Sequence, residues 1–292
     1  MEASPLRSRL MLVVTAVLFS TGGAVIKSGS LTAWQIASFR SGVASIALIA
    51  ALPEARRGWS WRILPVAAAY AATLISFVLA TRLTTAANAI FLQDTAPLYV
   101  LLLGPWLLAE PVRRADLVYM LAIGCGMALF FVSAPPAAAT APDPARGNLV
   151  ALASGIAWAL TITGLRWLAR AGEGNASMAT VTLGNLLAFV IALPLALPVR
   201  AAGPSDVGVI LYLGIFQIGL AYVFLTRGIR HVPAFEATAV LLLEPAMNPI
   251  WTWLVHGEKP GAWALAGGAI ILSATLANTW RQARTRTAAT IG

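Results

Sequence analysis

The sequence predicts an all-α integral membrane protein with ten transmembrane helices, arranged as two inverted five-helix repeats around a central cavity. Three observations predict this fold. Of the 292 residues, 59% are hydrophobic and only 11% are charged, and the mean hydropathy is +0.80, whereas ordinary soluble domains carry roughly 25% charged residues. The apolar residues form ten runs of membrane-spanning length, and a segment late in the first half of the chain recurs in the second half.

The ten apolar runs are the predicted spans, and most have about the 18–25 residues that cross roughly 30 Å of hydrocarbon. Their hydrophobic periodicity is weak, as expected for helices that are apolar on nearly all faces. The first run follows Arg7 and Arg9 and is longer than the roughly 7–15 residues of a signal-peptide core, so we interpret it as an uncleaved helix. The spans lie near residues 10–27, 33–52, 63–81, 84–108, 116–134, 147–166, 176–197, 207–226, 234–256 and 262–280.

The basic residues predict the orientation of these spans. If the N-terminus is cytoplasmic, fourteen of the 20 Lys and Arg residues fall on the cytoplasmic side, five fall outside, and Arg40 lies within the second span. Such an excess of inside positive charge is typical of membrane proteins. We therefore expect both termini in the cytoplasm of a bacterial cell, with the chain in the inner membrane and in contact with the lipid bilayer. The net charge of +9 is thus a topology signal, and no nucleic acid is expected as a partner.

The repeat divides the chain into domains. Pro97 and Glu110 in the fourth span match Pro245 and Glu258 in the ninth, and Arg82, Ala86 and Ala89 match Arg230, Ala234 and Ala237 at the same offset. The Pro/Ala-rich stretch "SAPPAAATAPDPARG" lies between the two halves and is a plausible linker. Because each half has an odd number of spans, the second half must be inverted. The predicted domains are a first repeat at 1–134, a linker at 135–146, a second repeat at 147–281 and a basic cytoplasmic tail at 282–292.

On these residues the chain resembles the EamA type of the drug/metabolite transporter superfamily. The segments "AIFLQDTAPLYVLLLGPWLLAE" and "LLLEPAMNPIWTWLVHGEKP" lie where the paired signature segments of that family lie. Within the superfamily the chain is most similar to bacterial exporters of aromatic and other neutral amino acids. The resemblance implies export from the cytoplasm through a central cavity between the halves. Asp94 departs from the family pattern, in which an uncharged residue is expected.

Prolines within the fourth and ninth spans predict interrupted helices. A proline inside a helix donates no N–H and clashes with the carbonyl four residues earlier. Pro97 and Pro245 are therefore predicted to kink their helices, to act as hinges, and to free backbone carbonyls toward protein or a wet cavity. The alternative is that these prolines only shape helix packing.

Three ionisable residues lie well inside the spans: Asp94, Glu244 and Arg40. A charge at this depth is costly unless it is paired, hydrated or neutralised, so such residues default to a functional role. Asp94 and Glu244 are candidates to bind a substrate ammonium or to carry a coupling proton. Arg40 is a candidate to bind a substrate carboxylate. For each residue the alternative is a structural ion pair or hydrogen bond within the protein.

Aromatic and amide side chains near the middle of the spans predict the lining of the cavity. A mixed polar and aromatic lining suits a zwitterion with an apolar side chain. Each of these residues alone is equally compatible with a packing role. The predicted lining residues are Phe19, Tyr70, Gln93, Tyr99, Trp158, Gln217 and Tyr222.

The leading hypothesis is a secondary transporter that exports small amphipathic metabolites, foremost aromatic or apolar amino acids, by alternating access. A multidrug exporter of organic cations is the alternative in the same class. An integral-membrane enzyme or a sensor is a remote alternative, because the sequence has no GxxxxGK[ST] motif and its only histidines, His231 and His256, lie near span ends. Neither a cofactor nor a metal is expected. The single Cys125 excludes an internal disulfide, and the glycines of the fifth and tenth spans suit packing or a homodimer.

Overall fold

The computed structural model describes residues 5–109, 112, 114–132, 137–172, 176–228, 232, 237 and 240–291. Within these residues the chain is helical, and the only extended pairing is an isolated bridge between Ala138 and Ala141. Several residues of the sequence analysis lie outside the described residues: Glu110, Arg230, His231, Ala234, parts of the linker, and the start of the ninth predicted span.

The helices follow the order of the predicted spans, with the first, fourth and eighth spans each divided. The first half contains α1 (Pro5–Ser20), α2 (Gly22–Lys27), α3 (Ala33–Ala51), a short 3-10 helix (Pro53–Arg56), α4 (Ile63–Leu83), α5 (Ala86–Gln93), α6 (Ala96–Leu107) and α7 (Arg114–Val132). The second half contains α8 (Pro144–Arg170), α9 (Ser177–Ala196), α10 (Pro204–Leu211), a π-helical segment (Tyr212–Leu220), α11 (Ala221–Gly228), α13 (Leu243–His256) and α14 (Ala262–Ile291).

Among the described residues, eight helical segments are long and apolar enough to cross a membrane. The fifth and ninth predicted spans correspond to α7 and α13, whose apolar parts are shorter. The prediction of ten spans therefore stays a prediction. Helix α14 continues to Ile291, through most of the tail predicted at 282–292.

Capping side chains explain several helix boundaries. The Thr32 hydroxyl accepts from the Gln35 N–H while the Gln35 side chain accepts from the Thr32 N–H, so a capping box begins α3. Asp143 caps α8 by accepting from the Arg146 N–H, and Pro144 takes the first helical position, where its missing N–H is harmless. The sixth span therefore begins three residues earlier than Gly147, inside the predicted linker.

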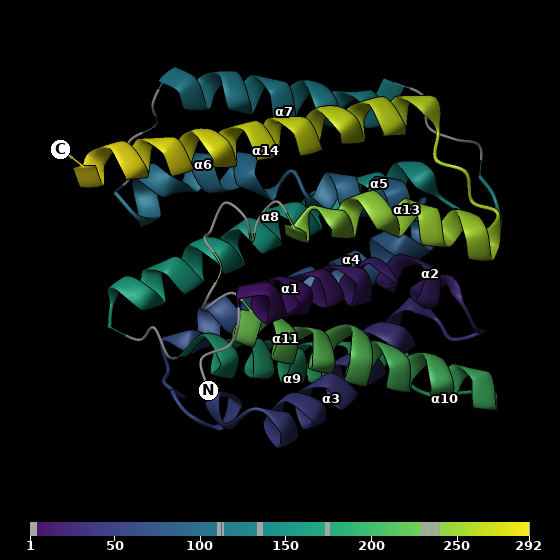
Figure 1. The fold of residues 1–292 in the computed structure, drawn as a ribbon. Helices are drawn as coiled ribbons and strands as arrows, with labels where there is room; N and C mark the ends of the chain where they lie inside the picture. The colour runs from purple at the N-terminus through teal and green to yellow at the C-terminus, as the bar shows by residue number, and fades with distance from the viewer. Residues whose placement is uncertain are drawn as a thin grey trace.

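The two halves interlock across the bundle. Helix α4 packs against α8 and α9, and in the same way α11 and the π-helical segment pack against α1 and α3. Helices α3 and α9 contact each other, as do α7 and α14, which run side by side along one edge (Figure 1). The third span of each half therefore packs against the first two spans of the other half.

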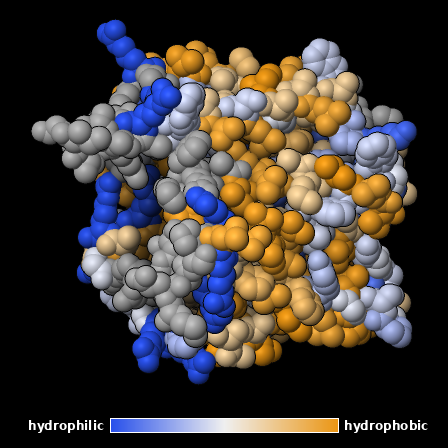
Figure 2. Space-filling view, viewed as in Figure 1, coloured by the Kyte–Doolittle hydropathy of each residue, from blue (hydrophilic) through white to orange (hydrophobic). Residues whose placement is uncertain are grey.

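The surface carries a broad apolar band. In Figure 2 hydrophobic side chains cover the middle of the molecule, and hydrophilic ones gather at the end where Figure 1 places both chain termini. Large apolar side chains are exposed on the surface, among them Trp106 and Leu254. Such a band would be costly in water and fits a lipid environment.

Candidate functional site

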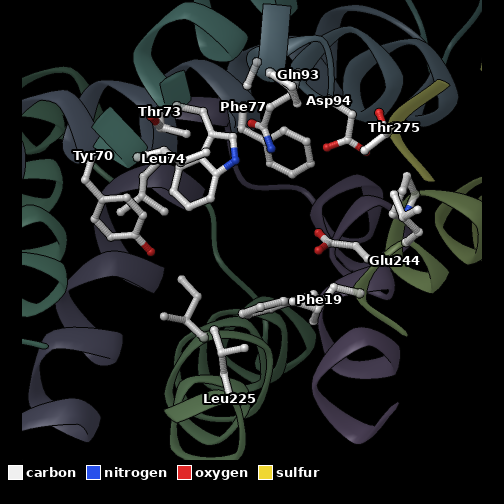
Figure 3. A pocket seen from close by; sticks show the side chains of 18 of the residues that line it. Phe19, Tyr70, Thr73, Leu74, Phe77, Gln93, Asp94, Leu225, Glu244 and Thr275 are labelled. Carbon is white, nitrogen blue, oxygen red and sulfur yellow. The ribbon is translucent and has the colours of Figure 1, made fainter. Parts of the chain in front are cut away.

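A cavity of ≈ 400 Å³ lies between the helices of both halves. Its volume is within the range of about 300–1,000 Å³ that is typical of small-molecule sites. The Leu225, Glu244 and Thr275 side chains border it from α11, α13 and α14, and Phe19 borders it from α1 (Figure 3). Helix α13 begins near the middle of the bundle, away from the end where the chain termini lie (Figure 1), so the cavity that it borders lies in the interior of the bundle.

The structure places nearly all predicted site residues around this one cavity. Its lining includes Phe19, Arg40, Tyr70, Gln93, Asp94, Pro97, Trp158, Gln217, Tyr222, Glu244 and Pro245. These side chains come from both halves of the chain and are up to 226 positions apart in sequence, between Phe19 and Pro245. The cavity therefore depends on the packing of the halves against each other.

Four aromatic rings form a continuous row along the cavity. The Tyr70 and Tyr222 hydroxyls lie 2.8 Å apart, and their ring centroids are separated by 6.4 Å. Phe19 contacts Tyr222 edge-on at 5.5 Å, and Trp158 contacts Tyr70 at 6.2 Å between ring centroids. The row alternates between halves, since Phe19 and Tyr70 come from α1 and α4, and Trp158 and Tyr222 from α8 and α11.

A break in the fourth span forms another part of the wall. Helix α5 ends at Gln93 and α6 begins at Ala96, with Asp94 between them. The Ser154 hydroxyl of α8 donates to Gln93 Oε1 over 2.7 Å and so fixes the amide. Gly155 lets α8 pack closely against the end of α5, because a Cβ at this position would lie 3.0 Å from the carbonyl oxygen of Leu92. The break thus presents the Asp94 carboxyl at the cavity.

The helix interruptions differ from the predicted kinks. Pro97 lies in the first turn of α6 and Pro245 in the first turn of α13, rather than within continuous helices. In a first turn the missing N–H of proline costs no intrahelical hydrogen bond. The prolines therefore begin new helices beside the cavity, whereas Pro105 and Pro249 are the prolines inside α6 and α13. A hinge role for Pro97 and Pro245 stays a prediction.

The three ionisable residues border the cavity, and none of them forms an ion pair with another described residue. Arg40 is only 2% exposed; one guanidinium nitrogen donates to the Leu74 carbonyl over 3.1 Å, and its Nε has no hydrogen-bond partner. Asp94 Oδ2 is buried and also has no partner. Within the described part of the chain, no ion pair joins Arg40 to a carboxylate.

Tyr99 is the exception among the predicted lining residues. The α5–α6 break changes the face that α6 presents, so the Tyr99 hydroxyl donates to Met127 Sδ on α7 over 3.7 Å and does not border the cavity. The sequence analysis also missed Thr73, Leu74 and Phe77. These residues share a helix face with Tyr70 at spacings of three, four and seven, so Tyr70 and helical periodicity would have identified them.

A second buried charge cluster closes the opposite end of the bundle. Lys27, at the end of α2, lies 2.8 Å from Glu258 Oε2 just after α13, and both side chains are nearly inaccessible to solvent. The Lys27 ammonium also donates to the carbonyls of Thr84 and Thr140, and Glu258 Oε1 accepts from the Ala86 N–H over 2.7 Å. The pair joins the two halves. Glu258 thus has a buried partner, although the sequence placed it beside the exposed Lys259.

Comparison with known proteins agrees with this architecture. A pseudopaline exporter, CntI, of Pseudomonas aeruginosa (strain UCBPP-PA14) is 26% identical over 276 residues, which cover 92% of this chain and 94% of the exporter. An uncharacterized transporter of Archaeoglobus fulgidus is 25% identical over 294 residues, covering 94% of this chain and 98% of that protein.

A solved crystal structure has a TM-score of 0.61 at 18% identity and covers 94% of this chain and 97% of its own, which supports the fold alone. The profile of the EamA-like transporter family matches two stretches, residues 6–132 and 145–280. Together these stretches take in most of the chain. The protein therefore belongs to the EamA-like transporter family and is a multi-pass membrane transporter.

Proposed function

We propose that this protein is a secondary transporter that exports small amphipathic metabolites, foremost aromatic or apolar amino acids, by alternating access of the cavity between its halves. The observation that carries the proposal is the cavity itself. It combines the aromatic row with ionisable groups and amides in a volume of ≈ 400 Å³. An apolar side chain fits against Phe19, Tyr222, Tyr70 and Trp158, and the polar groups fit a charged backbone.

Two inverted five-helix repeats are part of this proposal. The two separate matches of one family profile and the exchange-related helix contacts support them. The pairs Phe19–Tyr222 and Trp158–Tyr70 support them too, because each joins a first helix of one half to a third helix of the other. Alternating access then requires the end with the Lys27–Glu258 pair and the end with the chain termini to open in turn.

Orientation and membrane complete the proposal. Hydrophilic side chains gather at the end that holds the chain termini (Figure 2), and the predicted topology puts fourteen of the 20 Lys and Arg residues on that side, which supports cytoplasmic termini in a bacterial inner membrane.

The alternative of an organic-cation exporter is favoured by one observation, the pair of carboxyl groups Asp94 and Glu244 in the cavity. The chain is 26% identical to a pseudopaline exporter, so pseudopaline is a further candidate substrate.

Transport into proteoliposomes tests the proposal. The panel contains aromatic, aliphatic and charged amino acids, a quaternary-ammonium dye and pseudopaline, with only a substrate gradient imposed and then with an added pH gradient. We expect saturable transport of aromatic and apolar amino acids. Transport of the dye or of pseudopaline without the amino acids would replace the proposed substrate class.

A matched pair of tryptophan variants identifies the site of transport. Trp158→Ala is expected to change the ranking of aromatic and aliphatic substrates, because Trp158 borders the cavity. Trp106→Ala removes the same side chain from a position that is 88% exposed on the lipid-facing surface. It should leave the ranking unchanged. Equal effects of the two substitutions would contradict the role of the cavity.

A further inference from the structure

The ionisable groups of the cavity are arranged along an axis. Arg40 donates to the Leu74 carbonyl on α4, the helix that carries Tyr70, whereas Asp94 borders the cavity from the α5–α6 break and Glu244 borders it from α13. In Figure 3 Asp94 and Glu244 lie on one side of the cavity, and Tyr70 lies on the opposite side. The acidic groups and the basic group are therefore separated across the space that a substrate would occupy.

Neither end of this axis forms an ion pair with another of the described residues. Arg40 is 2% exposed, yet its guanidinium donates to the uncharged Leu74 carbonyl, and its Nε has no hydrogen-bond partner among the described residues. On the other side, Asp94 Oδ2 has no partner, and Glu244 forms no side-chain hydrogen bond or ion pair with the described residues. An unpaired charge in a membrane interior costs several kcal/mol in principle. A bound ligand with opposite charges at its two ends would balance both sites at once.

We propose that the cavity binds its substrate as an oriented zwitterion, with the carboxylate toward Arg40 and the Tyr70–Tyr222 hydroxyl pair and the ammonium toward Asp94 and Glu244. This proposal rests on the proposed function and assigns the substrate class and its orientation. Arg40 is the specificity-determining residue, because it distinguishes an amino acid from an amine that lacks the carboxylate. Asp94 and Glu244 distinguish an amino acid from an N-acylated acid that lacks the ammonium.

The hydroxyl pair contributes to the carboxylate end. Two hydroxyls that bond to each other at 2.8 Å use one proton between them, so the second proton is available to an anion. The guanidinium supplies charge-assisted donors next to it. The aromatic row continues from these hydroxyls to Phe19 and Trp158, so an apolar side chain has a surface on which to pack while both charged ends are bound.

Binding to purified protein in detergent tests the orientation with three probes: phenylalanine, phenethylamine and N-acetylphenylalanine. The unmodified protein should bind phenylalanine most tightly. Arg40→Gln should weaken phenylalanine binding by about tenfold to a hundredfold, as expected for loss of hydrogen bonds to a charged group, and leave phenethylamine binding unchanged. Arg40→Lys should restore part of the loss. Asp94→Asn combined with Glu244→Gln should remove the preference for phenylalanine over N-acetylphenylalanine.

Arg146→Gln is the matched control, because Arg146 is an exposed arginine at the start of α8. It removes the same charge and should leave all three affinities unchanged. Equal losses of phenylalanine and phenethylamine in Arg40→Gln would overturn the orientation while leaving an amino-acid transporter intact. Binding of phenethylamine alone by the unmodified protein would overturn both proposals in favour of organic cations. Binding of none of the three probes would overturn both as well.

Discussion

The protein buries two groups of ionisable residues, which differ in whether they are paired. One group is Lys27 and Glu258 at one end of the bundle, and the other is Arg40, Asp94 and Glu244 in the cavity. The first group is an ion pair at 2.8 Å, supported by hydrogen bonds with three backbone groups. The second group has unpaired charges and unpartnered polar atoms. Burial makes unmatched charge expensive. The contrast therefore assigns the first group to holding the halves together and leaves the second available for a ligand.

The largest expected effect on stability comes from breaking the Lys27–Glu258 ion pair. Lys27→Met leaves the Glu258 carboxylate buried without its counter-ion, so the free energy of unfolding should fall by about 3–5 kcal/mol. Thermal unfolding in detergent measures this. The double variant Lys27→Met/Glu258→Gln should recover part of the loss, because neither charge remains.

Lys259→Met is the control for that prediction, since Lys259 is the exposed neighbour of Glu258. It should change stability by less than about 0.5 kcal/mol, as surface substitutions usually do. A loss in Lys259→Met as large as that in Lys27→Met would show that net charge, and not the pair, determines the result.

A smaller effect is expected where the cavity wall depends on a close backbone approach. Gly155→Ala places a Cβ 3.0 Å from the Leu92 carbonyl oxygen and 3.2 Å from that of Gln93. Overpacking of this kind costs about 1–3 kcal/mol. Gly124→Ala is the matched control, because a Cβ there meets nothing within 4 Å. It should be neutral or stabilising by helix propensity, and thermal unfolding of both variants decides the comparison.

A still smaller effect is expected within the aromatic row. Tyr222→Phe removes the hydrogen bond to Tyr70 and should lower stability by about 0.5–1.5 kcal/mol. Tyr99→Phe removes the weaker contact with Met127 Sδ outside the cavity and should have less effect. If Tyr99→Phe cost more, the hydroxyl pair would not be the stronger contact in the protein interior.

The smallest effect on stability is expected for Arg40, and it tests most directly whether the two groups of charges differ. Arg40→Met removes a buried charge that has no counter-ion among the described residues, so stability should stay within about 1 kcal/mol of the unmodified protein or rise. Measured beside Lys27→Met, it separates the two groups of charges. A loss of about 3–5 kcal/mol would mean that the Arg40 charge is satisfied in the free protein, and the comparison would fail.

The sequence identified most of the cavity because its residues are conspicuous in an apolar helix. Asp94, Glu244 and Arg40 are charges within spans, and Tyr70, Trp158 and Tyr222 are mid-span aromatics with polar atoms. Placing a charged or polar group inside a membrane costs free energy, so such residues indicate a functional site wherever they occur in a span. Leu74, Ile162 and Leu225 also border the cavity but resemble any lipid-facing or core residue in sequence, so composition does not reveal them.

The contacts of Tyr99 and Lys27 could not be predicted from the sequence. The sequence indicated that Pro97 interrupts the fourth span, but not that the helix would end at Gln93 and begin again at Ala96, which turns Tyr99 toward Met127. The partnership of Lys27 with Glu258 joins residues from opposite halves of the chain. Both outcomes depend on long-range packing.

By itself the sequence determined the family, the membrane class and the residue types of the candidate site, because apolar length and buried charge are local properties of the chain. Only the tertiary structure decided which of these groups are satisfied. Whether a buried charge has a partner depends on segments that are distant in sequence, such as α2 and the end of α13, or α3 and α4. That decision distinguishes a charge that stabilises the fold from one left free to bind a substrate.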